Sequence, residues 1–219
     1  MPKSVLTAQD WILIVSEIAD AIEARKDQLN ELDGAIGDGD HGVSMSIGFR
    51  AVRETLAKLE DDQSMDRIFS LVGRTFLAAA GGAIGPLIGS MWMDTGKMLQ
   101  GCEQFGPAEC RRMLEAMDAA VVRRGKANLG DKTILDALHP AAVAARETQE
   151  DDLAAILKQA AEAAEAGAQA TASMIARTGR SSRLGERTLG HQDAGATTLA
   201  LILDTIYRAV AQETVKEST

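Results

Sequence analysis

Apolar residues recur along most of the chain at spacings of three and four, the pattern of amphipathic helices, and no alternating strand pattern extends beyond a few residues. A capping signal at Thr7 and Asp10 precedes the first stripe and predicts a helix over residues 7–30. Seven further helices are expected at about 45–59, 64–80, 86–101, 107–124, 132–146, 151–178 and 194–213. The sequence therefore predicts an all-α bundle of about eight helices.

The composition agrees with this fold class. Apolar residues make up 46% of the 219 residues and aromatic residues only 3%, which favours helices and argues against a sandwich or barrel of strands. The connection at 147–152 is a short acidic turn, and no linker rich in proline or serine interrupts the chain. We expect a single domain over residues 1–219.

The charge balance excludes some partners. With 23 basic and 32 acidic residues, the net charge of −9 has the wrong sign for binding nucleic-acid phosphates or an anionic membrane surface. Cys102 and Cys110 do not form a C-x-x-C pair, and the N-terminus has no apolar signal core. These features predict a cytoplasmic protein with two free thiols.

One stretch requires a test as a membrane span, because nineteen uncharged residues lie between Arg74 and Asp94. Its glycines at 81, 85 and 89 have the G-x-x-x-G spacing of packed transmembrane helices. However, the pairs Gly81-Gly82 and Gly85-Pro86 break a helix in the middle of the stretch. We expect a loop that leads into a buried helix, and no membrane segment.

Most of the twenty glycines lie in four clusters, at 34–42, 81–89, 125–130 and 179–195. Connections within helical bundles are usually short and need few glycines. Glycine-rich loops of this length indicate backbone that approaches a ligand closely or presents its N–H groups to an anion. The clusters are therefore candidate binding loops.

The first cluster holds three carboxylates, Asp33, Asp38 and Asp40, within eight residues. Without a cation they would repel one another, and oxygen ligands without cysteine favour Mg²⁺ or Ca²⁺ over zinc. The spacing differs from that of an EF-hand, so Mg²⁺ held by carboxylates together with ligand phosphates is the better match. The alternative is a solvated turn that caps the second helix.

The second cluster, GGAIGP at 81–86, ends where a helix is expected to begin, so its free N–H groups could receive a phosphate. Alternatively, its glycines only permit close helix packing. The sequence has no Walker A motif, and no G-x-G-x-x-G stands between a strand and a helix, which excludes P-loop and Rossmann nucleotide sites.

The remaining clusters mix glycine with charged residues. Asp193 could be the N-cap of the last helix, and His191 could contact phosphate or hydrogen-bond within the loop. The basic residues of these clusters could attract phosphates, face a partner or be solvated surface charges; they are Lys126, Lys132, Arg183 and Arg187.

Together the four segments resemble the nucleotide-binding L subunit, DhaL, of dihydroxyacetone kinases, which also occurs as the C-terminal domain of single-chain ATP-dependent enzymes. The resemblance covers essentially the whole chain. Its motifs are LDGAIGDGDHG (32–42), GGAIGPLIG (81–89), RGKANLGDKTILDAL (124–138) and GRSSRLGERTLGHQDAGAT (179–197). Three positions depart from the family pattern, with Ser44 in place of Asn, Ile84 in place of Ser and Ala194 in place of Pro.

The resemblance implies an eight-helix antiparallel up-and-down barrel with a nucleotide and Mg²⁺ in the loops at one end. Asp33, Asp38 and Asp40 are then expected to coordinate a pair of Mg²⁺ ions that bridge the nucleotide phosphates. The nucleotide-binding residues carried over from the family pattern are His41, Gly42, Val43, Ser44, Ala83, Ile84, Gly125, Ile134, Arg180, Asp193, Ala194 and Gly195.

The resemblance also implies a two-component kinase. In the family, a separate K subunit or domain holds the acceptor ketose covalently through a histidine, so this chain supplies no nucleophile and is expected to be inactive alone. The donor is either ADP used as a coenzyme and rephosphorylated by a phosphotransferase-system protein, or free ATP. The ketose could be dihydroxyacetone or erythrulose. A homodimer, and a Mg-nucleotide-bound regulator of a transcription factor, are further readings of the same resemblance.

Overall fold

The computed structural model describes residues 4–59 and 63–216. Within them the chain forms eight α-helices and two 3-10 segments: α1 (Ala8–Ile36), α2 (His41–Leu56), α3 (Met65–Ala79), α4 (Ile84–Met98), α5 (Pro107–Gly125), α6 (Leu135–Glu147), α7 (Leu153–Ala170), η1 (Thr171–Ser173), η2 (Ser181–Thr188) and α8 (Ala194–Lys216). These described residues contain no strand, only one antiparallel bridge between Leu6 and Phe105. The prediction of an all-α protein is confirmed.

The capping signals predicted from the sequence are present. The Thr7 hydroxyl accepts from the Asp10 N–H at 3.3 Å, and the Asp10 carboxylate accepts from the Thr7 N–H at 2.7 Å. These reciprocal bonds use backbone groups that the first turn of a helix leaves unpaired. Pro107 occupies the first turn of α5, where its missing N–H costs nothing.

Two helix ends differ from the sequence prediction by more than five residues, and one 3-10 segment is additional. Helix α1 continues to Ile36 instead of ending near residue 30, because Leu29 and Ile36 extend its buried stripe. Helix α7 ends at Ala170 instead of 178, where the buried Thr171 hydroxyl donates to the carbonyl oxygen of Ala168. The 3-10 segment η2 was not predicted, since its residues have no apolar periodicity. The ends of α1 and α7, which differ from the prediction, both border glycine-rich loops.

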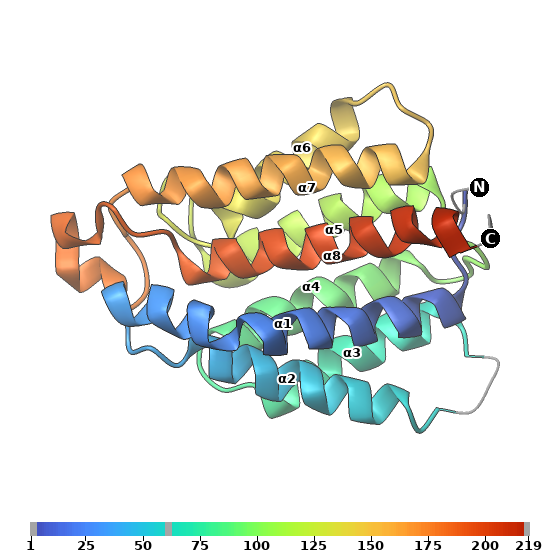
Figure 1. The fold of residues 1–219 in the computed structure, drawn as a ribbon, viewed down its shortest axis with the longest axis horizontal. Coiled ribbons are helices and arrows are strands. Elements are labelled where there is room, and N and C mark those ends of the chain that lie inside the picture. The colour runs from blue at the N-terminus through green and yellow to red at the C-terminus, as the bar shows by residue number, and fades with distance from the viewer. Residues whose placement is uncertain (1–3, 60–62, 217–219) are drawn as a thin grey trace.

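The helices form a closed antiparallel ring. Each helix packs against the next in sequence, and α8 packs against α1. The loops α1–α2, α3–α4, α5–α6 and α7–α8 lie at one end of the ring, at the left in Figure 1, and the beginning of α1 and the end of α8 lie at the other. The predicted eight-helix up-and-down barrel is therefore confirmed, with all four glycine clusters at one end.

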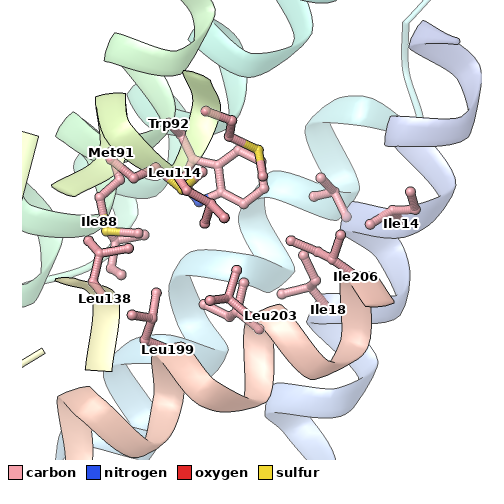
Figure 2. Packing of buried hydrophobic residues seen from close by; sticks show 14 of the residues in the cluster. Ile14, Ile18, Ile88, Met91, Trp92, Leu114, Leu138, Leu199, Leu203 and Ile206 are labelled. Atoms are coloured by element: carbon pink, nitrogen blue, oxygen red, sulfur yellow. The ribbon is translucent and has the colours of Figure 1, made fainter. Parts of the chain in front are cut away.

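Side chains fill the interior of the ring. Figure 2 shows apolar residues of α1, α4, α5, α6 and α8 converging on it, among them Ile18, Trp92 and Leu203, each no more than 1% exposed. Nearby, the ring of Trp11 meets those of Phe69 and Phe105 edge-on at 4.7 and 4.8 Å between centroids. This packing leaves the loops at the end of the ring as the place for a ligand.

Within the described residues, one stretch of α8, Ala194–Ala211, passes a length and composition test for a membrane span, with mean hydropathy 1.2. Half of it is buried inside the bundle, as in the core helix of a soluble protein, so the test is weak evidence for a span. The uncharged stretch between Arg74 and Asp94 is divided between α3 and α4 by a loop, as the sequence predicted.

Candidate functional site

The three aspartates of the first glycine cluster lie together. One carboxylate oxygen from each of Asp33, Asp38 and Asp40 lies within 4.8 Å of the others. Asp33 belongs to the last turn of α1, whereas Asp38 and Asp40 are exposed in the loop that leads to α2. The arrangement offers a hard, oxygen-only set of ligands, which suits Mg²⁺.

Asp33 also organises the loop itself. Its Oδ2 accepts the backbone N–H groups of Gly39 at 2.8 Å, Asp40 at 3.0 Å and His41 at 3.3 Å. Gly39 has a φ of 77°, a region in which a Cβ atom is strained. The sequence left a turn that caps α2 as the alternative to a metal site. Both are present, because Asp33 accepts the loop N–H groups through one oxygen and none of them through the other.

A positively charged side chain from far along the sequence contacts this cluster. Arg180, the residue before η2, forms an ion pair with the Asp38 carboxylate. Both side chains are exposed, so solvent screens the pair. Its importance is geometric, because it places the predicted nucleotide residue Arg180 against the predicted metal ligands.

His41 joins α2 to the last helix, α8, at this end. Its Nε2 lies 2.8 Å from the hydroxyl oxygen of Thr198 in α8, and burial lowers the pKa of His41 although the Asp33 charge opposes the shift. Gly42 is buried against α1, where a Cβ would lie 2.0 Å from the carbonyl oxygen of Lys26. Val43 is exposed and Ser44 is half-buried.

The predicted residues around the start of α8 lie together. Asp193 caps the helix, its Oδ2 accepting the N–H of Ala196 at 2.8 Å. Burial raises the pKa of Asp193 to about 6, with the carboxylates of Asp136 and Asp33 adding to the shift. A Cβ at Gly195 would lie 3.0 Å from Asp193 Oδ2 and 3.6 Å from Ile134 Cβ, and Ala194 is buried.

The second glycine cluster packs closely in one part and is open in the other. Gly85 and Gly89 allow close packing, since a Cβ there would lie 2.5 Å and 2.9 Å from carbonyl oxygens of α3 and the loop after it. In contrast, Gly81 and Gly82 face open space. Helix α4 begins with no side-chain cap, which leaves N–H groups free at Ala83 and Ile84.

Gly125 lies close to α4, because a Cβ atom added there would lie 3.3 Å from Cδ2 of Leu87. The predicted residues thus fall into two groups. Asp33, Asp38, Arg180 and their neighbours meet the start of α8 through the His41 contact. In the described part of the chain, no backbone hydrogen bond joins Ala83, Ile84 or Gly125 to them.

Lys132 is not a solvated surface charge, which was one of the alternatives left open by the sequence. Its side chain is buried, and its ammonium donates to backbone carbonyl groups in the segment between α7 and α8. The buried Asp136 was also missed; it accepts the N–H groups of Gly130 at 2.6 Å and Thr133 at 2.7 Å and thereby shapes the α5–α6 loop. Both residues belong to the segment GDKTILD (130–136), in which polar residues are neighbours of buried apolar residues in the sequence.

A groove of about 700 Å³ lies between α1, α7 and α8 and contains none of the predicted site residues. Four of its charged side chains form ion pairs with each other, Lys158 with Glu162 and Arg208 with Asp204. Because the cluster of three carboxylates lies outside this groove, we place the candidate site at the glycine-rich end.

Known proteins resemble this chain over most of its length. The DAK2 domain family matches residues 35–208. A Listeria innocua protein, named PEP-dependent dihydroxyacetone kinase 2, ADP-binding subunit DhaL, is 38% identical over 90% of this chain and 94% of its own. The D-erythrulose kinase of Mycolicibacterium smegmatis is 32% identical over 92% of this chain but only 35% of its own length.

The fold also matches a solved enzyme. The dihydroxyacetone kinase from C. freundii, solved in complex with AMP-PNP and Mg²⁺, aligns with a TM-score of 0.67 and 25% identity. The alignment covers 90% of this chain and 33% of that one, so the chain spans about a third of the solved enzyme. With the family match over most of its length and a close relative over nearly all of it, the chain belongs to the DAK2 domain family and, within it, to the DhaL subunits of dihydroxyacetone kinases.

Proposed function

We propose that this chain is the nucleotide-binding subunit of a two-component kinase that transfers a phosphoryl group to a short ketose, dihydroxyacetone in the first instance. The observation that carries the proposal is the cluster of three carboxylate oxygens within 4.8 Å, at the end of the ring where all four glycine-rich loops meet. The DhaL relative named as an ADP-binding subunit supports it.

The donor set fits Mg²⁺. Asp33, Asp38 and Asp40 supply only oxygen atoms, and two of them are exposed to an incoming ligand. We propose that they hold two Mg²⁺ ions, which when bound neutralise charge on the nucleotide phosphates. The nearby His41 is engaged by Thr198, so it orients the start of α2 and is not counted among the ligands.

The nucleotide would lie across the loops. In this proposal the uncapped N-terminus of α4 donates N–H groups to phosphate oxygens from Ala83 and Ile84, a role that needs no hydroxyl at position 84. Arg180 supplies positive charge to the transferred group. The remaining contacts of the proposed pocket come from His41 to Ser44, Gly125, Ile134, and Asp193 to Gly195.

The acceptor and donor belong to partners in this proposal. The ketose is held on a K subunit, and the donor is bound ADP rephosphorylated by a phosphotransferase-system protein, as the name of the PEP-dependent Listeria relative supports. Free ATP is the alternative donor. The similarity to a D-erythrulose kinase favours a four-carbon ketose as the second candidate acceptor. A single cytoplasmic domain over residues 1–219, able to form a homodimer, completes the proposal.

Reconstitution tests the proposal. We expect ketose phosphate to form only when the chain is combined with a K subunit, Mg²⁺ and one of the two donor systems, phosphoenolpyruvate with its phosphotransferase proteins or ATP. The donor that sustains turnover identifies the class, and parallel assays with dihydroxyacetone and erythrulose identify the acceptor. Binding of Mg-nucleotide without turnover under every combination would favour the regulatory module that docks on a transcription factor.

A further inference from the structure

Lys132 has an unusual environment for a lysine. Its side chain is buried, 2% exposed, and its backbone adopts a positive φ of 62°. The Nζ atom donates to the carbonyl oxygens of Thr171 at 2.6 Å and Thr188 at 2.9 Å, and to that of His191. An ammonium group has three N–H bonds, so all of its donors are used.

The three carbonyl groups belong to one segment, residues 171–193, which we call the α7–α8 loop. Thr171 opens this loop, Thr188 ends η2, and His191 lies just before α8, so a single ammonium ties both ends of the loop to the α5–α6 loop. A backbone bond from Arg177 N–H to the Asp131 carbonyl at 3.1 Å adds a second tie between the same two loops.

The α7–α8 loop carries residues that the proposed function uses. Arg180 forms its ion pair with Asp38 from the exposed middle of the loop. The N–H of Asp193 donates to the Thr171 hydroxyl at 2.9 Å, next to the carbonyl group that Lys132 binds. The place of both residues relative to the aspartates therefore depends on how firmly the loop ends are fixed.

We propose that Lys132 is a positioning residue for phosphoryl transfer, acting through the α7–α8 loop to hold Arg180 and Asp193 against the aspartates of the α1–α2 loop. This proposal rests on the proposed function. The core of the ring lies elsewhere, so loss of the ammonium is expected to free the loop and leave the helices folded. Burial lowers the pKa of Lys132, and the neighbouring Asp193 opposes the shift.

Limited proteolysis tests the positioning directly. The variant Lys132→Met removes the ammonium at similar volume, and Lys97→Met, at an exposed lysine paired with Asp94, is the matched control. We expect trypsin to cleave the variant at least tenfold faster within 177–187, where four arginines are exposed, while Lys97→Met and the wild type cleave alike. Equal cleavage rates in all three proteins would overturn the proposal.

Kinetics separate positioning from a general structural role. In the reconstituted kinase we expect Lys132→Met to lower kcat at least tenfold and to change the KM for ketose less than twofold, because the ketose is held by the partner. In the Arg180→Gln background the same substitution should lower kcat less than twofold further. Effects that multiply, or a kcat within twofold of wild type, would contradict the proposal.

Two controls keep the outcomes distinct. Wild-type turnover is measured first: if it is absent with every donor, the proposed function fails and the catalytic part of this proposal fails with it, whatever the proteolysis shows. If the wild type turns over and both Lys132 criteria are unmet, only this proposal fails. Should Lys132→Met not fold, Lys132→Gln, which keeps two N–H donors, is judged by the same criteria.

Discussion

His41 and Thr198 stand 157 residues apart in the sequence, and His41 Nε2 lies 2.8 Å from the Thr198 hydroxyl oxygen. The contact brings the N-terminus of α2, with its carboxylate loop, against the first turns of α8, with Asp193. Because Thr198 is completely buried, the contact is fixed by the core of the ring. It brings the first and last glycine-rich loops together.

Removing this contact should weaken binding. Thr198→Val keeps the shape of the side chain but leaves the partly buried imidazole without its partner, at a cost of about 1–2 kcal/mol in unfolding free energy. We expect the affinity for Mg-nucleotide to fall several-fold, as measured by calorimetry. Thr205→Val, whose hydroxyl bonds only the Leu201 carbonyl within α8, is the control and should leave affinity unchanged.

Neutralising the carboxylate cluster should abolish metal-dependent binding with little loss of stability. Asp38→Asn removes a ligand charge and a screened ion pair with Arg180, and such exposed pairs contribute at most about 1 kcal/mol. We expect Mg-dependent nucleotide affinity to fall at least tenfold while the Tm without ligand stays within a few degrees. Asp151→Asn, at a fully exposed residue in the α6–α7 turn, should match the wild type; unchanged binding by Asp38→Asn would remove this aspartate from the site.

The close approach of α2 to α1 predicts a pair of glycine variants with opposite outcomes. At Gly42 an added Cβ would lie 2.0 Å from the carbonyl oxygen of Lys26, so Gly42→Ala should force the helices apart and cost about 1–3 kcal/mol or more. At Gly81 the added atom meets open space, and Gly81→Ala should not lower stability. Thermal unfolding distinguishes them, and equal Tm values would refute the close contact.

The raised pKa of Asp193 predicts a pH dependence of stability. Its pKa is raised to about 6 in the folded protein, from about 3.8, so the folded state holds this proton more tightly than the unfolded chain. The resulting contribution to stability is complete below about pH 4 and is lost as the pH rises through 6.

Asp193→Asn keeps an acceptor for the Ala196 N–H but cannot ionise. Relative to the wild type, the variant should gain stability between pH 4 and pH 7, by at most about 3 kcal/mol, since one pKa unit corresponds to about 1.4 kcal/mol. Chemical denaturation of the unliganded proteins across this range measures the difference. A difference that stays constant with pH would show that Asp193 does not carry the shift.

Much of the fold could be predicted because the helices bury regular apolar stripes, and capping at Thr7 is a local signal. The same reasoning stopped α1 too early, since Asp33 and Gly34 look like loop residues although Ile36 is buried beyond them. The four glycine clusters lie at one end because successive helices run in opposite directions. Sequence patterns imply this arrangement only through the number of helices.

The metal-binding part of the candidate site was predicted from residue type, whereas its nucleotide-binding residues came from the family resemblance. Three close aspartates suggested a metal, and the structure brings their oxygens together. The tie between Lys132 and the α7–α8 loop could not be predicted, because a lysine in a polar loop is usually solvated and its carbonyl partners lie 39 to 59 residues away. Contacts between backbone and side chains of distant loops leave no periodic trace.

Calorimetric titration of the metal-stripped protein with ADP and with ATP, each with and without Mg²⁺, tests the central claim most directly. Mass spectrometry of the natively purified protein accompanies it and identifies any retained nucleotide. The account predicts saturable binding at one site per chain that weakens at least tenfold when Mg²⁺ is withheld, with co-purifying ADP if the phosphotransferase donor is correct. Absence of Mg-dependent binding of either nucleotide would contradict it.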